Sequence, residues 1–386
     1  MNIRYFIPTE ILFGEGKLAE LHTKKLPGKK ALIVISSGKS MKQNGYLARV
    51  EKELELAGVE HVLFDRILPN PVLRHVMEGA AFARENHCDF VVGLGGGSSI
   101  DSAKAIAVMA ANPGNYWDYN FCEHGGKKPL VNAPLPIVAI TTTAGTGTEA
   151  DPWTVTTNEE THEKTGFGCD ATYPVLSIVD PELMMTVPAH LTAYQGFDAL
   201  FHATESVINK GEQEIGEMFA LKAVSLMAEY LPRAIADGSD REARAKTALA
   251  NTLAGFYMLC TSEHSMEHAM SAFHHEMPHG AGLIMISRAY YQHFADCHAC
   301  DGQMIKLARA MGKADAVTAQ DFVDVLAQME KRCGVDQLKM SDYGVTEEEL
   351  PNFVRNARTA MGGLFYADPA PLTDEDVLNI YRKSFA

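Results

Sequence analysis

Two stretches of the chain carry residues of metal-ligand type, aspartate or histidine, at the spacing of one helical turn. Asp198 and His202 stand at positions i and i+4, and so do His264 and His268, so each pair would project from one face of a helix. His279 follows in a Pro-His-Gly sequence. Neutral imidazoles combined with a carboxylate suit Fe(II), Zn(II), Co(II) or Ni(II). The pattern therefore predicts a metal site, although the spacing alone does not say which of the histidines are ligands.

An ordinary explanation competes with this one, because the chain has 15 histidines and a single histidine is more often packed or solvent-facing than a ligand. His274 and His275, for example, would make an unremarkable surface pair. What favours a site is the Ala- and Met-rich helical setting of the others, where unpaired imidazoles would be costly to bury.

A glycine-rich stretch at 95–99, Gly-Gly-Gly-Ser-Ser, follows a buried apolar run at 90–94 and precedes a helix-forming segment. Glycines at such a place let backbone amides approach a pyrophosphate, and the helix N-terminus adds its positive dipole end. The stretch differs from the Rossmann fingerprint, since Ser98 stands where the third glycine would be. An ordinary tight turn is the alternative. A Thr/Gly-rich loop at 141–149 ends another strand-like run, and together the two loops favour a nucleotide crevice.

The elements that must position these residues change in character along the chain. Strands are expected at 31–35, 90–94 and 136–140, alternating with helices at 45–57 and 100–107, which predicts a parallel sheet with helices on its faces. Beyond Val187-Pro188 the apolar spacing is helical, and breaks are expected at Gly211, Pro232, Gly238 and Gly302. The helical segments expected there are 190–208, 213–231, 241–273, 281–312, 318–333 and 373–384. We therefore predict an α/β domain over 1–186 and an all-helical domain over 187–386, with a ligand site in the cleft between them.

Composition narrows the possible partners. The formal net charge is −15, with no basic run longer than a pair, which argues against nucleic acid or an anionic membrane surface as partner. No apolar stretch is long enough to span a membrane, and the N-terminus lacks the features of a secretory signal. The 7 cysteines are thinly spread, and only Cys297 and Cys300 have Cys-x-x-Cys spacing, which we interpret as an inert helical pair. A reduced cytoplasm is the expected location.

Taken together, these stretches resemble the iron-containing (group III) alcohol dehydrogenases. The match runs in order from about residue 5 to residue 300, and its motifs are jointly specific. The residues that carry it are Gly95-Gly96-Gly97-Ser98-x-x-Asp101-x-x-Lys104, Thr142-Thr143-Ala144-Gly145-Thr146-Gly147-x-Glu149, Gly196-Phe197-Asp198-Ala199-x-x-His202-x-x-Glu205, His264-x-x-x-His268 and Pro278-His279-Gly280.

The resemblance implies an α/β dinucleotide-binding domain with a parallel sheet followed by an all-α metal-binding domain, as in dehydroquinate synthase-like folds. It implies Fe(II), with Zn(II) as an alternative, held by Asp198, His202, His264 and His279, and His268 beside the nicotinamide and substrate as the catalytic group. The segment before Pro-His-Gly is one residue longer than usual, which makes His275 a rival ligand. The positions implied to contact the cofactor are Asn70, Gly96, Gly97, Ser98, Asp101, Thr141, Thr142, Thr146, Lys164 and Leu183.

The loop at 37–40, which follows the strand at 31–35, decides the expected form of the cofactor. An acidic residue at this place would accept hydrogen bonds from the ribose 2′-hydroxyl and repel a 2′-phosphate. Here the loop reads Ser37-Gly38-Lys39-Ser40, which offers a lysine and no acid, so we predict a preference for NADP(H) over NAD(H). The alternative is that these are ordinary turn residues with a solvated Lys39.

The predicted activity is hydride transfer between a nicotinamide cofactor and a small primary alcohol, diol or aldehyde, with the metal as Lewis acid. Further copies of the chain, in a homodimer or larger homo-oligomer, are the other expected partners. A glycerol dehydrogenase-like polyol oxidoreductase is the near alternative. A dehydroquinate synthase would need a basic pocket for its phosphorylated acid, which the acidic helical half disfavours. A metal-dependent hydrolase would explain the histidines but not the glycine loop, and a non-enzymatic metal or nucleotide binder would explain only one half of the pattern.

Overall fold

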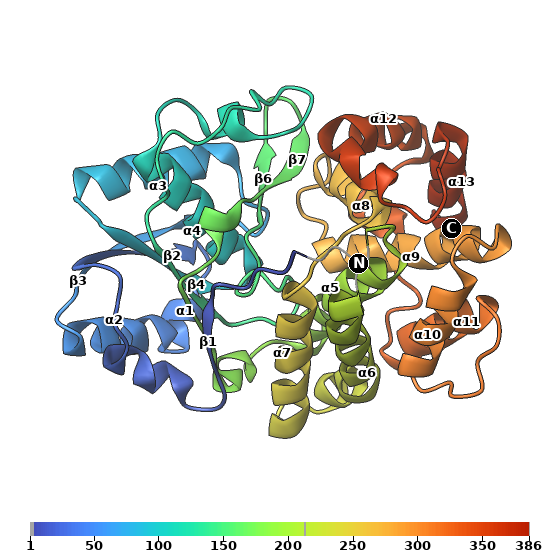
Figure 1. The fold of residues 1–386 in the computed structure, drawn as a ribbon, viewed down its shortest axis with the longest axis horizontal. Helices are drawn as coiled ribbons and strands as arrows, with labels where there is room; N and C mark the ends of the chain where they lie inside the picture. Colours follow the sequence, from blue (N-terminus) through green and yellow to red (C-terminus); the bar gives the residue numbers. More distant parts are fainter. Residues whose placement is uncertain (1–3, 212–213, 386) are drawn as a thin grey trace. The chain divides into compact units, whose positions relative to one another are not determined.

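The computed structural model describes residues 4–211 and 214–385. Contacts within the chain divide it into two compact units, Met1–Thr186 and Val187–Ala386 (Figure 1). The division falls where the sequence changes from mixed strand and helix to helix alone. Among the described residues, no helix has the length and apolar character that a membrane crossing requires.

Unit 1 is built on a six-stranded parallel sheet with the strand order β1-β8-β5-β4-β2-β3. The sheet strands are β1 Glu10–Phe13, β2 Lys30–Ser36, β3 Glu60–Ile67, β4 Phe90–Gly95, β5 Ile137–Thr141 and β8 Leu176–Val179. An antiparallel hairpin of β6 Thr154–Asn158 and β7 Glu163–Phe167 accompanies it. The helical segments are η1 Lys17–Thr23, α1 Ser40–Gln43, α2 Tyr46–Leu56, α3 Leu73–Glu85, α4 Gly97–Ala111, η2 Tyr116–Tyr119, η3 Asp170–Thr172 and η4 Pro181–Met184.

Both faces of this sheet are covered, which explains the apolar runs Ala31–Ile35 in β2 and Phe90–Leu94 in β4. Successive strand side chains point to opposite faces. Leu32 and Val34 belong to one core with α3 and α4, whereas Ile33 and Ile35 belong to another with α2. Figure 1 shows α2 and α3 on opposite sides of the sheet. The predicted parallel sheet with helices on its faces is confirmed.

The direction of winding reverses inside the sheet. From β2 the chain proceeds outward to β3, then crosses back to β4 on the other side of β2 and continues to β5 and β8. In open α/β sheets, ligands bind outside the carboxyl ends of the strands at such a reversal. The carboxyl ends of β2 and β4 are therefore the place in unit 1 where a ligand is expected.

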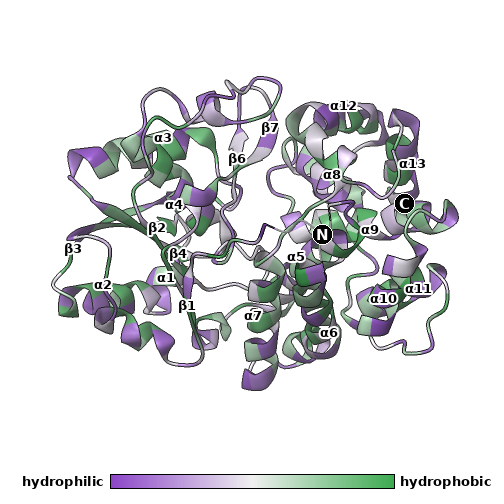
Figure 2. Cartoon of the chain, viewed as in Figure 1, coloured by the Kyte–Doolittle hydropathy of each residue, from purple (hydrophilic) through white to green (hydrophobic). Residues whose placement is uncertain are grey.

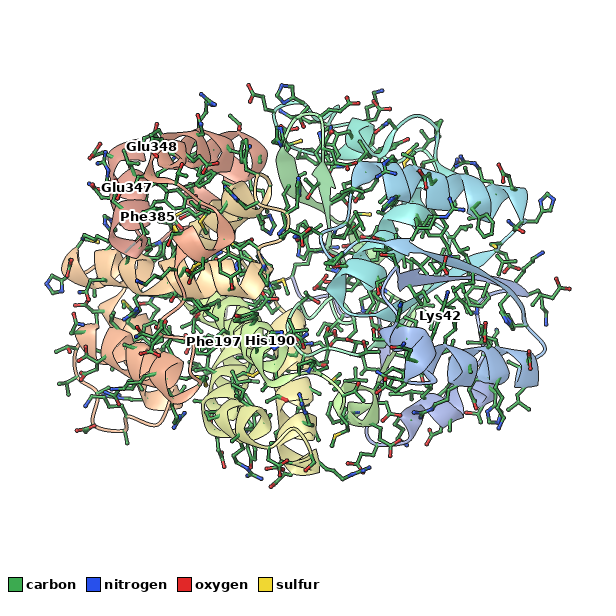
Figure 3. The ribbon with its side chains drawn as sticks, turned by 180° about the vertical axis from the view of Figure 1, so that it is seen from behind. Lys42, His190, Phe197, Glu347, Glu348 and Phe385 are labelled. Atoms are coloured by element: carbon green, nitrogen blue, oxygen red, sulfur yellow. The ribbon has the colours of Figure 1, made fainter. Side chains whose placement is uncertain are left out.

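Unit 2 is helical, and no strand occurs in its described part, 187–211 and 214–385. Phe197, at the centre of α5, is fully buried, whereas Glu347 and Glu348 are exposed (Figure 3). Hydrophobic and hydrophilic residues share each of α6 and α7, as expected of helices with one buried face (Figure 2). The helices are α5 Ala189–Ile208, α6 Glu214–Ala236, α7 Arg241–Gly255, α8 Ser262–Ser271, α9 His279–Asp296, α10 Asp301–Ala310, α11 Gln320–Arg332, α12 Leu350–Met361 and α13 Asp374–Ser384, with short turns η5 Met340–Tyr343, η6 Glu347–Glu349 and η7 Gly362–Tyr366.

Several predicted helix limits are wrong. The segment 241–273 is two helices, α7 and α8, and 281–312 is also two, α9 and α10. At the second break, His298 has a positive φ of 54°, and its amide bonds back to the carbonyl of Ala295. Gly302 lies inside α10 rather than ending a helix, and α12 was not expected.

Pro232 was expected to end a helix, but α6 continues past it to Ala236. A proline has no amide proton, so the carbonyl four residues earlier loses its helical partner. That carbonyl belongs to Ala228, and it accepts a hydrogen bond of 2.6 Å from the guanidinium of Arg332 instead. A side chain of α11 thus replaces the missing bond, which explains how the helix tolerates its proline.

Candidate active site

The three predicted cofactor loops follow three neighbouring strands of unit 1. The loop at 37–40 follows β2, the glycine loop at 96–98 follows β4, and the threonine loop begins at Thr141, the last residue of β5. These strands are adjacent and parallel, so their carboxyl ends meet at one edge of the sheet. The structure therefore brings the three loops together at the point where the winding reverses.

The glycines are needed because the threonine loop packs directly against them. A Cβ atom on Gly96 would lie 2.9 Å from Cγ2 of Thr143, and one on Gly97 would lie 2.4 Å from Cγ2 of Thr146. Gly95 has a φ of 144°, which disfavours other residues. Gly97 opens α4, and the first turn of a helix offers amides without helical partners. The two loops thus form one surface of bare backbone and hydroxyl groups, which suits a phosphate.

The other predicted cofactor residues lie in different surroundings within unit 1. Lys164 Nζ donates a hydrogen bond of 3.5 Å to Asn70 Oδ1, so these two lie together. Leu183 is only 1% exposed and packs into the apolar core of unit 1. The Asp101 carboxylate is buried, and it accepts hydrogen bonds from the hydroxyl of Thr148 and the amide of Val155. In this structure Asp101 ties α4 to the threonine loop and the hairpin.

In unit 2, three histidine nitrogens surround one carboxylate oxygen. Asp198 Oδ1 lies 3.6 Å from Nδ1 of His202, 3.6 Å from Nε2 of His264 and 3.5 Å from Nε2 of His279. These separations are long for hydrogen bonds. They are close to the roughly 3.4 Å that separates ligand atoms placed tetrahedrally about 2.1 Å from one ion. The ligand atoms of Asp198, His264 and His279 all lie within 4.8 Å of one another, whereas His202 is grouped with His264 and Cys260.

The polar atoms at the centre of this cluster lack other partners. Among the described residues, neither Asp198 Oδ1 nor His264 Nε2 has a hydrogen-bond partner, and both atoms are buried. Burial alone would raise the pKa of Asp198, but the neighbouring His202, His279 and His264 hold it below its usual range. Buried, unpaired polar atoms that face one point are costly without a ligand. The donor set fits a divalent cation, with one carboxylate and three imidazoles.

Two glutamates orient the imidazoles from behind. Glu205 accepts a hydrogen bond from Nδ1 of His264, and Glu267 accepts one from Nδ1 of His279. A carboxylate at Nδ1 fixes the tautomer, so that Nε2 presents a lone pair towards an ion. Both glutamates are fully buried. Both glutamates stand near histidines in the sequence, but no role was predicted for either of them. The helical spacing of Asp198, His202 and Glu205 is the signal that could have identified Glu205.

His268 lies beside this cluster rather than within it. Its ring centre is 5.2 Å from that of His279 and 6.3 Å from that of His264, and its Nδ1 is 2.8 Å from Sδ of Met361. The side chains of Glu267, His268 and His279 form a separate group with ligand atoms within 4.8 Å of one another. His275, the rival ligand, is exposed and belongs to no such group among the described residues.

Cys260, which the sequence did not single out, lies next to the histidines. Its thiol, His202 and His264 form a group whose ligand atoms all lie within 4.8 Å of one another. Burial raises the pKa of this thiol above its usual value, although His264 opposes the shift. A sulfur atom thus stands beside two of the histidines.

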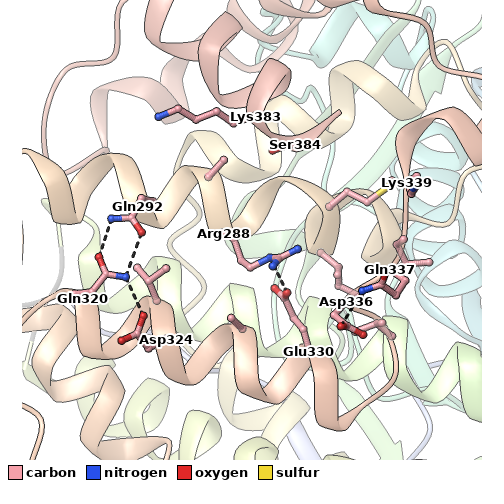
Figure 4. Close-up of a pocket in the computed structure, with 17 residues that line it drawn as sticks. Arg288, Gln292, Gln320, Asp324, Glu330, Asp336, Gln337, Lys339, Lys383 and Ser384 are labelled. Atoms are coloured by element: carbon pink, nitrogen blue, oxygen red, sulfur yellow. Dashed lines mark hydrogen bonds and ion pairs between the residues drawn. The ribbon is translucent and has the colours of Figure 1, made fainter. Parts of the chain in front are cut away.

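A cavity of about 510 Å³ lies elsewhere in unit 2, lined by residues of α9, α11, the segment after α11 and the end of α13 (Figure 4). None of the predicted site residues lines it. Several of its polar groups are partnered by neighbours: Arg288 pairs with Glu330 at 3.0 Å, and Gln320 bonds to Gln292 and Asp324. Unlike the Asp198 cluster, the cavity shows no convergent unpaired ligand atoms.

Family models match most of the chain. The model of the family described as iron-containing alcohol dehydrogenase matches residues 8–181, and that of its C-terminal domain matches residues 192–385. An NAD-dependent methanol dehydrogenase of Bacillus methanolicus is 32% identical over 98% of this chain and 99% of its own. A 1,3-propanediol dehydrogenase of Citrobacter freundii is 32% identical over 99% of this chain and 98% of its own.

A solved structure agrees over the whole length. The archaeal alcohol dehydrogenase ADH/D1 of a Red Sea brine pool has a TM-score of 0.94 and 36% identity, covering 100% of this chain and 99% of that one. A solved 1,3-propanediol oxidoreductase has a TM-score of 0.89 and 30% identity, covering 100% of both chains. The chain therefore belongs to the iron-containing alcohol dehydrogenase family.

Proposed function

We propose that the protein is a metal-dependent NAD(P)(H) alcohol dehydrogenase, or aldehyde reductase, whose protein ligands are Asp198, His202, His264 and His279. The observation that carries the assignment is the buried Asp198 Oδ1, which has three histidine nitrogens at 3.5–3.6 Å and no hydrogen-bond partner among the described residues. Small primary alcohols and diols are the proposed substrates, because the relatives are named for methanol and 1,3-propanediol. The glycerol-like alternative has no such support among these relatives.

Each group of the chain has a role in this proposal. Fe(II), or alternatively Zn(II), supplies Lewis-acid polarisation of the substrate oxygen when bound. Glu205 and Glu267 hold the Nε2 atoms of His264 and His279 towards Asp198. His268, 4% exposed and adjacent to the cluster, is the proposed proton carrier. The amides of Gly96, Gly97 and Ser98 bind the pyrophosphate of the cofactor.

An assay of a panel of alcohols and aldehydes tests the activity. The protein is stripped of metal, reloaded with Fe(II) or Zn(II), and supplied with NADPH or NADH and a short aldehyde, and loss of the reduced nicotinamide absorbance is followed. We expect metal-dependent turnover of short aldehydes and the reverse reaction with primary alcohols or diols. Faster turnover of glycerol than of 1,3-propanediol would favour the polyol alternative, and metal-independent turnover would contradict the assignment.

We further propose a preference for NADP(H). Ser37, Gly38, Lys39 and Ser40 are all exposed after β2, and none of them is acidic. The nearby Asp65 of β3 is paired with Lys42 at 2.5 Å, which lowers the pKa of that carboxyl and offsets its charge. A single charge-assisted contact from Lys39 to a 2′-phosphate would contribute roughly 1–3 kcal/mol. The methanol-dehydrogenase relative is named NAD-dependent, so the proposal rests on this chain's own loop.

The Gly38→Asp variant tests this preference. A Cβ at Gly38 would have its nearest neighbour, Ser36 Oγ, at 3.5 Å, so a side chain fits there without strain. We expect the ratio of kcat/KM for NADPH over NADH to exceed one in the wild type and to fall in Gly38→Asp. Gly38→Asn, with the same size and no charge, should move the ratio much less. A wild-type ratio at or below one would refute the preference.

A further inference from the structure

Cys260 is half-buried, and its position differs from that of the buried cysteines. Cys88 and Cys122 lie in one apolar core of unit 1, and Cys300 and Cys333 lie in the core of unit 2. Cys260 belongs to none of these cores, and its thiol instead stands within 4.8 Å of ligand atoms of His202 and His264. It is a free cysteine. The thiol therefore lies beside two imidazoles.

The backbone at Cys260 is held in place by the helix that carries Asp198 and His202. Two α5 side chains and the residue that caps the helix, Asn209, hold three consecutive residues. Ser206 Oγ accepts from the amide of Leu259 at 3.0 Å, and Asn209 Nδ2 donates to the carbonyl of Cys260 at 3.1 Å. Glu205 Oε2 accepts from the amide of Thr261 at 2.5 Å. Because Glu205 also orients His264, one network fixes both the sulfur and the imidazole beside it.

An independent observation indicates that a ligand is missing at this point. His264 Nε2 and Asp198 Oδ1 are buried and have no hydrogen-bond partner in the described part of the chain. His264 belongs both to the group with Asp198 and His279 and to the group with His202 and Cys260. His264 is therefore common to both groups, and the thiol stands beside two of the four proposed ligands, His202 and His264.

We propose that Cys260 is a fifth protein ligand of the metal centre and makes it selective for thiophilic ions. The inference rests on the proposed Asp198, His202, His264 and His279 set, which contains no sulfur. On binding, the Sγ–H proton passes to solvent and a sulfur–metal bond forms, with no change of oxidation state. The thiolate and the Asp198 carboxylate together then balance the two positive charges of the buried ion. Thiolate ligands favour Zn(II) and Co(II) over Mn(II) and Mg(II).

The test uses the full chain loaded with Co(II), whose visible bands report occupancy of the site and whose near-ultraviolet charge-transfer band reports a bound thiolate. We expect both signals in the wild type. Cys260→Ser and Cys260→Ala should lose the charge-transfer band and keep the visible bands. Cys297→Ser, which changes an exposed cysteine, should retain both. In chelator competition, the Zn(II) affinity of Cys260→Ser should fall on the order of 10–100-fold, and the Mn(II) affinity should change much less.

The outcomes separate this inference from the proposed function. If the Co(II) protein shows visible bands but no charge-transfer band that depends on Cys260, and if the Zn(II) affinity of Cys260→Ser is unchanged, then Cys260 is not a ligand. The Asp/His metal site would remain supported. If no Co(II) band is lost when His264 is replaced, both the metal site and the thiolate ligand are contradicted. Thermal unfolding of each variant checks that loss of the band does not come from loss of the fold.

Discussion

At the level of single residues, the candidate centre depends on which nitrogen of each histidine is already engaged. Nδ1 of His264 and Nδ1 of His279 bond to buried glutamates, and the opposite nitrogen of each ring faces Asp198 Oδ1. Fixing an imidazole in this way removes the rotational freedom that it would otherwise lose on metal binding. The glutamates are therefore expected to contribute to affinity without touching an ion.

The Glu267→Gln variant tests that contribution. A neutral amide keeps the shape of the side chain but weakens the bond that holds His279, so metal affinity should fall on the order of 10–100-fold with the fold retained. Chelator competition with Zn(II) measures it. Glu348→Gln, which changes an exposed glutamate of η6, is the matched control (Figure 3). Equal affinities in the two variants would show that Glu267 does not position His279.

His264 and His268 are one helical turn apart but have different proposed roles. His264→Ala removes a nitrogen that faces Asp198, so we expect loss of bound metal by elemental analysis. His268→Ala removes a ring that stands beside the cluster, so metal should remain and kcat should fall by roughly 10²–10⁴-fold. His190→Ala, at the exposed start of α5, should change neither. The reverse outcome for the first two would mean that the extra residue before Pro278 exchanges their roles.

At the level of elements, helical spacing predicted where most helices lie but not where they break. The apolar pattern runs through 256–261, yet this segment is not helical because its backbone bonds to Ser206 and Glu205 of α5 and to Asn209, which caps that helix. The apolar spacing of a segment cannot reveal such bonds, because the bonding partners lie far away in the sequence. The same interruption places Cys260 near the histidines, which is why sequence reasoning missed it.

The strands show the same limit. The buried runs of β2, β4 and β5 were predicted because they are continuously apolar. The sheet-edge strands β1 and β3 were missed because they are only partly buried and carry charged residues. The glycine loop and the metal-ligand candidates could be found because local residue type determines their chemistry. Their supporting glutamates could not be assigned, because that role depends on tertiary geometry.

The proline in α6 yields a prediction about helix stability. If Arg332 replaces the bond that Pro232 removes, Arg332→Met should lower the free energy of unfolding by on the order of 1 kcal/mol. In a Pro232→Ala background the restored amide can bond to the Ala228 carbonyl, so the same change should cost less. Urea unfolding of the two single variants and the double variant measures the coupling. Additive effects would show that Arg332 does not compensate for the proline.

The buried Glu330 of α11 gives a prediction about pH. Burial raises the pKa of Glu330 to about 7, and Arg288 and Ser287 only partly oppose the shift. Because the folded protein binds this proton more tightly than the unfolded chain does, the protonated carboxyl stabilises the fold fully at a pH below its pKa in the unfolded chain. This stabilisation is lost as the pH rises towards 7, the pKa in the folded protein. Between pH 5 and pH 8 the stability of the wild type relative to Glu330→Gln should fall by roughly 2–3 kcal/mol. A difference independent of pH in urea unfolding would contradict this.

At the level of the whole molecule, the two kinds of ligand fall on different units. The glycine and threonine loops belong to Met1–Thr186, whereas the Asp198 cluster belongs to Val187–Ala386, and each unit has its own apolar core. The 34 lysines and arginines form no run longer than a pair, so phosphates must be held mainly by backbone amides. Metal and cofactor should therefore stabilise different parts of the chain.

Hydrogen exchange with and without each ligand tests this separation. Zn(II) at about 100 times its Kd should add about 2.7 kcal/mol to the unit that binds it. We therefore expect slower exchange in α5, α8 and the first turn of α9, where the proposed ligands lie. NADPH should slow exchange at 37–40, 96–98 and 141–146. His264→Ala should abolish the Zn(II) effect and keep the protection of these three loops by NADPH. Zn(II) protection at the loops with none in α5 and α8 would place the metal outside the Asp198 cluster.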